Sequence, residues 1–152
     1  LILAQNPELL VLDDFSLGLD PGYRRLFSDY LRDYARSENK TVFLTSHIIQ
    51  DMERLIDDCI IMDYGRILTQ QPIHELMENL RRYTCTVPEE YESRLPETFY
   101  HPSVLRNTLE TYSFLPPAEV EKCWKELQVP FTGLKGEQVG LEDAFIGLTG
   151  KY

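Results

Sequence analysis

The chain has 152 residues, a mass of 17.8 kDa and a net charge of −10, from 25 Asp and Glu against 15 Lys and Arg. This length fits one domain, or one domain and a fragment, and a 43% hydrophobic share with 8 Gly and 9 Pro excludes collagen-like, low-complexity and wholly disordered chains. The acidic balance disfavours general nucleic-acid binding, although a local phosphate site built from backbone N–H groups or a metal is compatible with it.

The sequence also bears on the compartment. No apolar run reaches the ~18 residues of a membrane-spanning helix, and the first residues show no secretory signal. The three cysteines are far apart, and Cys59 and Cys123 lie in apolar stretches. We therefore predict reduced, mostly buried thiols in a cytosolic protein, and no zinc site, because no C-x-x-C or paired His occurs.

The first elements are predicted from apolar runs and their ends. Residues 1–4 resemble the end of a helix that stops at Asn6-Pro7. Residues 9–13 form a continuous apolar run ending in acid, which is typical of a strand buried on both faces, and residues 41–45 predict a second such strand.

A helix is predicted to begin at Asp20-Pro21, since Asp accepts hydrogen bonds from free N–H groups and Pro fits the first turn. Apolar side chains then recur at helical spacing and are interpreted as core packing. They are Tyr23, Leu26, Phe27, Tyr30, Leu31 and Tyr34.

Strands and helices continue to alternate as far as residue 80. The predicted elements are a short helix near 52–56, strands at 59–62 and 67–68 around a turn at 63–66, and a helix over 72–80. Residues 1–80 are therefore assigned to an α/β domain with a mainly parallel sheet.

From Arg81 onward, repeated prolines divide the chain into shorter segments. The predicted elements are strands near 82–87, 108–114 and 131–139 and helices near 117–127 and 141–148. Residues 81–152 are thus expected to form a small α+β appendage.

Candidate chemistry lies where the two buried strands end, at Asp13-Asp14 and at His47. Ligands of open α/β sheets bind outside the carboxyl ends of strands. A carboxylate suits hydrated Mg²⁺, a second acid can orient or deprotonate water, and a His can donate to a phosphate oxygen. The alternative is structural: an acid pair can cap a helix, and a lone His after a strand can be a surface residue.

Together these residues form a more specific pattern. The stretch Leu9-Leu10-Val11-Leu12-Asp13-Asp14-Phe15-Ser16-Leu17-Gly18-Leu19-Asp20-Pro21 resembles the Walker B motif and D-loop of ABC-transporter ATPases, and Thr41-Val42-Phe43-Leu44-Thr45-Ser46-His47 resembles their switch strand and switch histidine. Tyr64-Gly65-Arg66-Ile67 is similar to the family's next hairpin. Residues 141–150 are similar to the C-terminal end of drug-exporter members of the ABC-2-like type.

The resemblance implies that residues 1–80 are the C-terminal part of an ABC ATPase domain, with a partial P-loop NTPase-type fold. It also implies roles for individual residues. Asp13 would hold Mg²⁺, Asp14 would be the general base that activates water, and His47 would contact the γ-phosphate of ATP. The expected cofactor-binding residues are Ser16, Gly18, Leu19 and Asp20, of which the last three match the D-loop that faces a partner subunit.

For the whole protein the resemblance implies an ATPase that couples ATP binding and hydrolysis to export. Its expected partners are a second ATPase subunit, paired head-to-tail around ATP, and a membrane-spanning permease. It would then lie in the cytoplasm at the inner face of the membrane, held there through the permease.

The sequence departs from the family in three ways. Asp14 stands where Glu is usual, which predicts slow hydrolysis because the carboxylate is one methylene shorter. Phe15 and Leu17 stand where Pro and Ser are more usual. No G-x-x-x-x-G-K-[ST] loop, glutamine loop or signature motif occurs. We therefore expect the chain to be the C-terminal portion of a longer ATPase, inactive alone and without tight ATP binding.

Two other functions are compatible with parts of the sequence. A phosphorelay receiver would use Asp13-Asp14 for Mg²⁺, but it needs a further strand-end Asp that accepts phosphate and a later strand-end Lys. Here the next strand ends in Ser46-His47, and no Lys closes the strand that ends at Asp63. Residues 81–152 would also suit a non-catalytic regulatory or dimerisation module.

Overall fold

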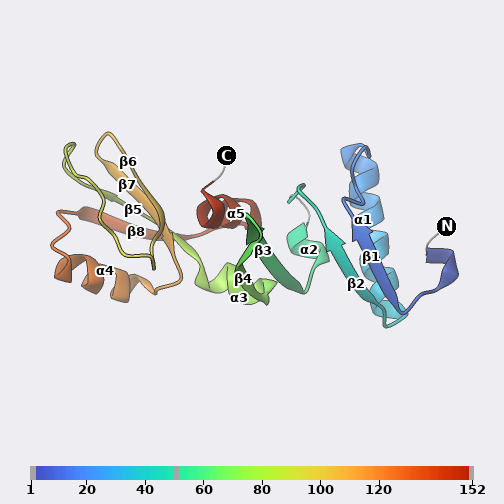
Figure 1. Ribbon diagram of the computed structural model, residues 1–152. Coiled ribbons are helices and arrows are strands. Elements are labelled where there is room, and N and C mark those ends of the chain that lie inside the picture. Colours follow the sequence, from blue (N-terminus) through green and yellow to red (C-terminus); the bar gives the residue numbers. More distant parts are fainter. Residues whose placement is uncertain (1–2, 50–51, 151–152) are drawn as a thin grey trace. The chain divides into compact units, whose positions relative to one another are not determined.

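Two compact units make up the computed structural model, Leu1–Ile56 and Asp57–Tyr152, and the structure describes residues 3–49 and 52–150 (Figure 1). This division into units does not test the predicted domain boundary at residue 80, which stays a prediction. The architecture is mixed α/β, as the sequence predicts.

The first unit is a strand, a helix and a second strand with two short helical turns. Its elements are η1 (Leu3–Gln5), β1 (Leu9–Asp13), α1 (Pro21–Ser37), β2 (Thr41–Thr45) and α2 (Met52–Leu55). The strands pair in parallel, and α1 is the connection between them (Figure 1). The predicted strands and helix are confirmed. Part of the helix predicted for residues 1–4 lies outside the described residues, and η1 occupies the rest.

One prediction about this unit is wrong: neither strand is buried on both faces. Val11 and Phe43 are opposite each other in the register and are 66% and 53% exposed, whereas Leu10, on the other face of β1, is buried. Within the described part of this unit, α1 is the one long helix, and it covers one face of the two strands (Figure 1). The opposite face, which carries Val11 and Phe43, is exposed.

The aromatic stripe of α1 is also less buried than the sequence predicts. Leu31 is fully buried, but Tyr23, Leu26 and Tyr30 are exposed. A two-stranded sheet is narrower than the apolar stripe of a 17-residue helix, so the described unit covers only part of that stripe.

The second unit contains a hairpin and a four-stranded sheet. Its elements are β3 (Asp58–Asp63), β4 (Arg66–Pro72), α3 (Ile73–Asn79), β5 (Arg81–Thr86), β6 (Tyr100–Leu105), β7 (Thr108–Ser113), α4 (Pro117–Glu126), β8 (Thr132–Gln138) and α5 (Leu141–Thr149). The order of the four-stranded sheet is β6-β7-β5-β8, and all its pairings are antiparallel, as is the β3–β4 hairpin. Among the described residues, parallel pairing is therefore confined to β1 and β2.

The core of the second unit lies between the four-stranded sheet and α4. Trp124 of α4 is fully buried, 5.8 Å from the ring of Phe99 and 5.4 Å from that of Phe131. The other buried members of this cluster are Tyr83, Cys85, Val87, Leu109 and Val120. The predicted elements of residues 81–152 are confirmed, and β6 is an additional edge strand that contains Pro102, which an edge strand tolerates.

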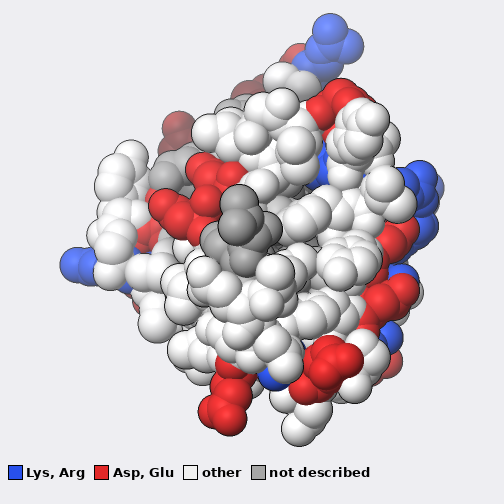
Figure 2. Space-filling view, turned by 90° about the vertical axis from the view of Figure 1, so that its right-hand side faces the viewer, with Lys and Arg blue, Asp and Glu red and all other residues white. Residues whose placement is uncertain are grey.

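Charged side chains are unevenly distributed on the face of the molecule that Figure 2 draws. On the face drawn in Figure 2, Asp and Glu form several separate groups, while Lys and Arg lie around the margin. None of the helices in residues 3–49 and 52–150 combines the length and apolar character needed to cross a bilayer.

Candidate functional site

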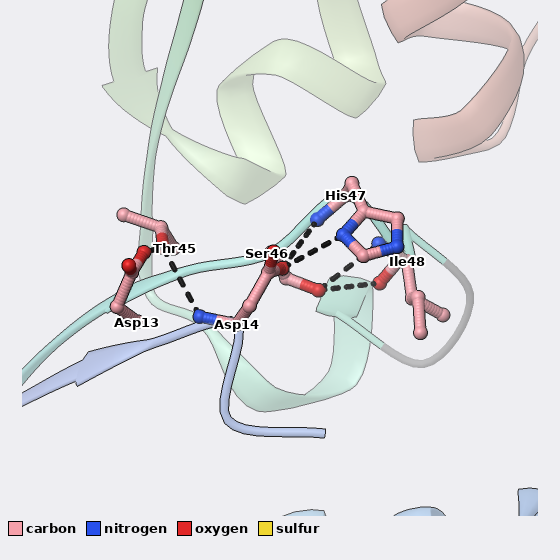
Figure 3. Close-up of polar contacts among 6 residues, drawn as sticks. All are labelled: Asp13, Asp14, Thr45, Ser46, His47 and Ile48. Carbon is pink, nitrogen blue, oxygen red and sulfur yellow. Dashed lines mark hydrogen bonds and ion pairs between the residues drawn. The ribbon is translucent and has the colours of Figure 1, made fainter. Parts of the chain in front are cut away.

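The ends of β1 and β2 bring the predicted acidic residues and the predicted histidine together. The parallel register places Asp13 directly opposite Thr45, so the two strands end side by side on the same side of the sheet. Asp14 and His47 follow immediately, and their side chains point toward each other (Figure 3). The sequence placed Asp13, Asp14 and His47 at two strand ends, where ligands of open α/β sheets bind, and the roles of these residues stay predictions.

Asp14 leaves the strand in a left-handed conformation, with φ of 45°, and this turn directs its carboxylate toward β2. Oδ1 of Asp14 lies 2.8 Å from Nδ1 of His47 and accepts a second hydrogen bond from the backbone N–H of His47 at 3.3 Å. A carboxylate accepts hydrogen bonds, so the proton of this pair is assigned to Nδ1. The second ring nitrogen, Nε2, points away from Asp14 (Figure 3).

Ser46 shapes the turn that carries His47. Its hydroxyl donates to the carbonyl oxygen of Ile48 at 3.2 Å and accepts from the Ile48 N–H at 3.0 Å. These bonds close a short turn around His47, a usual role for Ser in loops. The histidine side chain is 61% exposed and that of Asp14 is 40% exposed, so both are accessible to a ligand.

Asp13 is held by β2. The hydroxyl of Thr45 donates a hydrogen bond to Oδ1 of Asp13, and the N–H of Asp14 donates to the carbonyl oxygen of Thr45 at 3.1 Å and to its hydroxyl at 3.3 Å. Within the described residues Oδ2 of Asp13 has no hydrogen bond. Thr45 was not among the predicted site residues, because its pairing with Asp13 depends on the strand register.

The segment between β1 and α1 contains the predicted D-loop residues. Gly18 has φ of 83°, a conformation that favours glycine, and Leu19 is exposed. Asp20 caps α1: its Oδ1 accepts from the N–H groups of Gly22 at 2.9 Å and Tyr23 at 3.2 Å. Ser16 is buried, and its hydroxyl has no hydrogen-bond partner among the described residues. The predicted role of these four residues in binding a cofactor stays a prediction.

The carboxylates fit a hydrated magnesium ion better than a metal held by protein ligands alone. Among the described residues no three His, Cys, Asp or Glu side chains form a metal-binding group. Mg²⁺ keeps several waters and takes one or two carboxylates, and the second oxygen of Asp13 is available for this.

Comparison with the sequences of known proteins shows which proteins this chain is similar to. The chain is 33% identical to the Nod factor export ATP-binding protein I of Ralstonia nicotianae and 30% identical to that of Rhizobium sp. strain N33, over 98% of its own length. Over 58% of its length it is 37% identical to the energy-coupling factor transporter ATP-binding protein EcfA2 of Staphylococcus aureus strain MRSA252, 32% of which is matched. The homologues of this chain are ABC-transporter ATP-binding proteins. No protein-family model matches the chain.

The chain spans about half the length of the curated relatives that it matches, 49% of each Nod factor export protein named above. The family resemblance predicted from the two strand-end motifs is confirmed, and the names of these two relatives describe export. The activity, substrates and partners of the whole protein belong to the proposal that follows.

Proposed function

We propose that this chain is the C-terminal portion of the ATP-hydrolysing subunit of an ABC transporter and carries part of its catalytic site. The observation that carries the proposal is the meeting of Asp13, Asp14 and His47 at one sheet edge, with Asp14 and His47 joined at 2.8 Å. The similarity to ABC ATP-binding proteins over 98% of the chain supports it independently.

Each residue has a distinct task in this proposal. Asp13 would hold Mg²⁺ directly or through water, with Oδ2. Asp14 would orient the attacking water and accept its proton, while its contact with Nδ1 fixes the histidine ring so that Nε2 faces a phosphate oxygen. Bound MgATP supplies the phosphoryl group and the positive charge that offsets the phosphate oxygens.

The D-loop residues would act between subunits. We propose that Gly18, Leu19 and Asp20, with Ser16 beneath them, face a second copy of the ATPase paired head-to-tail. The exposure of the turn at Gly18 and Leu19 supports this assignment. A permease subunit would hold the pair at the cytoplasmic face of the membrane and carry out export, with residues 81–152 as an accessory region.

The test uses the longer protein that contains this chain. Asp14→Asn removes the charge of the proposed base without changing its size, and should lower steady-state ATP hydrolysis by about 100-fold or more. His47→Ala should lower hydrolysis similarly, and neither variant should abolish nucleotide binding. Asp29→Asn, on the exposed surface of α1, is the control and should stay within about twofold of wild type. Unchanged hydrolysis in both site variants would refute the proposal.

A further inference from the structure

The hydroxyl of Thr45 contacts both acidic residues at once. It donates to Oδ1 of Asp13 and accepts from the backbone N–H of Asp14 at 3.3 Å. A hydroxyl has one hydrogen to donate and two lone pairs to accept, so a single side chain can make both bonds. Figure 3 shows Thr45 beside Asp13, with a dashed line from its side chain to the backbone nitrogen of Asp14.

We propose that Thr45 is a positioning residue for metal binding, a role that rests on the function proposed above. By occupying Oδ1, its hydroxyl fixes the rotamer of the Asp13 carboxylate and directs Oδ2 outward as the metal-facing oxygen. Residues that orient a ligand in this way typically change metal affinity by about 10- to 100-fold when they are removed.

The second bond ties the same hydroxyl to the turn at Asp14. The Asp14 N–H shares its hydrogen between the carbonyl oxygen and the hydroxyl of Thr45, at 3.1 and 3.3 Å. Asp14 follows the strand with a positive φ, so an anchor on its N–H defines where its carboxylate goes. Thr45 therefore couples the position of the proposed metal ligand to that of the proposed base.

The chain offers a matched control on the same strand. Thr41 lies four residues earlier on β2, so its side chain is on the same face as that of Thr45 and is likewise exposed. It is opposite Leu9 in the register, where there is no carboxylate. Thr→Val at either position keeps the β-branched shape and removes the hydroxyl, which separates positioning from strand stability.

The experiment compares Thr45→Val, Thr45→Ser and Thr41→Val in the longer protein. The first readout is the Mg²⁺ concentration for half-maximal ATP hydrolysis, alongside kcat and the KM for ATP. The second is the affinity for Mn²⁺, measured by electron paramagnetic resonance in the presence of adenylyl imidodiphosphate, which is not hydrolysed.

Thr45→Val should raise the half-activating Mg²⁺ concentration and the Mn²⁺ dissociation constant by about tenfold or more. Thr45→Ser, which keeps the hydroxyl, and Thr41→Val should each stay within about twofold of wild type. Equal metal affinity in Thr45→Val and wild type would overturn the inference and leave the proposed function intact. The same holds if Thr41→Val loses as much metal affinity as Thr45→Val. A wild-type protein without Mg²⁺-dependent nucleotide binding would overturn both.

Discussion

At the scale of single residues, the length of the Asp14 side chain decides how far its carboxylate reaches. The ABC family that the sequence resembles usually has Glu at this position, and in the structure the shorter side chain reaches His47 at 2.8 Å. A displacement of about 1 Å can change a catalytic rate by about 100-fold, so the missing methylene affects a proposed base strongly.

Asp14→Glu is therefore expected to raise steady-state ATP hydrolysis in the longer protein, by about tenfold or more. Asp13→Glu, which lengthens the neighbouring carboxylate and pushes it against Thr45, should instead lower hydrolysis. Both rates would be followed by phosphate release at saturating MgATP. An Asp14→Glu variant that is no faster than wild type would contradict the explanation by side-chain length.

Cys85 gives a prediction about pH. It lies in the core of the second unit, and burial raises the pKa of its thiol from 9.0 to about 11. Between these two values the unfolded chain releases the thiol proton while the folded chain keeps it. The free energy of unfolding must therefore fall as the pH rises through this window, since the folded state binds more protons.

The expected decrease from this group is about 1–2 kcal/mol between pH 8.5 and pH 11. It can be measured by guanidinium unfolding, followed by the fluorescence of Trp124. Cys85→Ala should show a smaller pH-dependent loss than wild type, although its stability at pH 8 is lower because of the lost packing. Cys123→Ala is the control for removing a thiol, because Cys123 is only half-buried and lies at the periphery of the cluster. Equal pH dependence of the unfolding free energy in wild type, Cys85→Ala and Cys123→Ala would contradict the assignment of this effect to Cys85.

At the scale of elements, the start of α1 depends on one side chain. Asp20 satisfies two N–H groups that would otherwise lack partners in the first turn. Asp20→Ala should therefore lower the free energy of unfolding of the first unit by about 1 kcal/mol, as judged by circular dichroism during urea unfolding. Asp20→Asn keeps the cap and should stay within a few tenths of a kcal/mol.

This pair of variants also separates two roles of Asp20. If the D-loop assignment holds, Asp20→Asn in the longer protein should impair hydrolysis while leaving stability near wild type. Asp33→Ala, on the exposed side of α1 and away from its start, serves as the control and should not destabilise the helix. A loss of stability in Asp33→Ala equal to that in Asp20→Ala would contradict the capping explanation.

The elements show what sequence patterns can and cannot predict. Apolar runs predicted β1 and β2, and the acidic residues and the histidine that follow these strands marked where a ligand site was expected. Exposure of Val11 and Tyr23 was not predictable, because burial depends on what packs against an element and not on its own composition. The role of Thr45 required the residue-by-residue register, which the pattern of two apolar strands leaves undetermined.

At the scale of the whole molecule, the two units differ in how much core they contain. The aromatic cluster around Trp124 belongs entirely to residues 57–152, whereas the described first unit buries few large side chains, chiefly Leu10, Leu31 and Met52. Stability follows buried apolar area, so the second unit should be the more stable of the two.

Residues 57–152 expressed alone should therefore fold. Trp124 is the chain's one tryptophan, so its fluorescence reports on the second unit specifically. Its urea transition should have the same midpoint in the fragment and in the 152-residue chain, while circular dichroism of the whole chain should show an additional transition at lower urea. A fragment without a cooperative transition would contradict the independence of this unit.

The crossover through α1 has a consequence for how the site comes into being. The hydrogen bonds between the acidic strand end and the second strand end join residues 31 to 33 positions apart. The chain between the two strand ends must close into a loop before any of these hydrogen bonds can form. During translation, a nascent chain therefore carries two fully hydrated aspartates until Thr45 and His47 have emerged from the ribosome, and the proposed catalytic geometry appears only when the second strand docks beside the first.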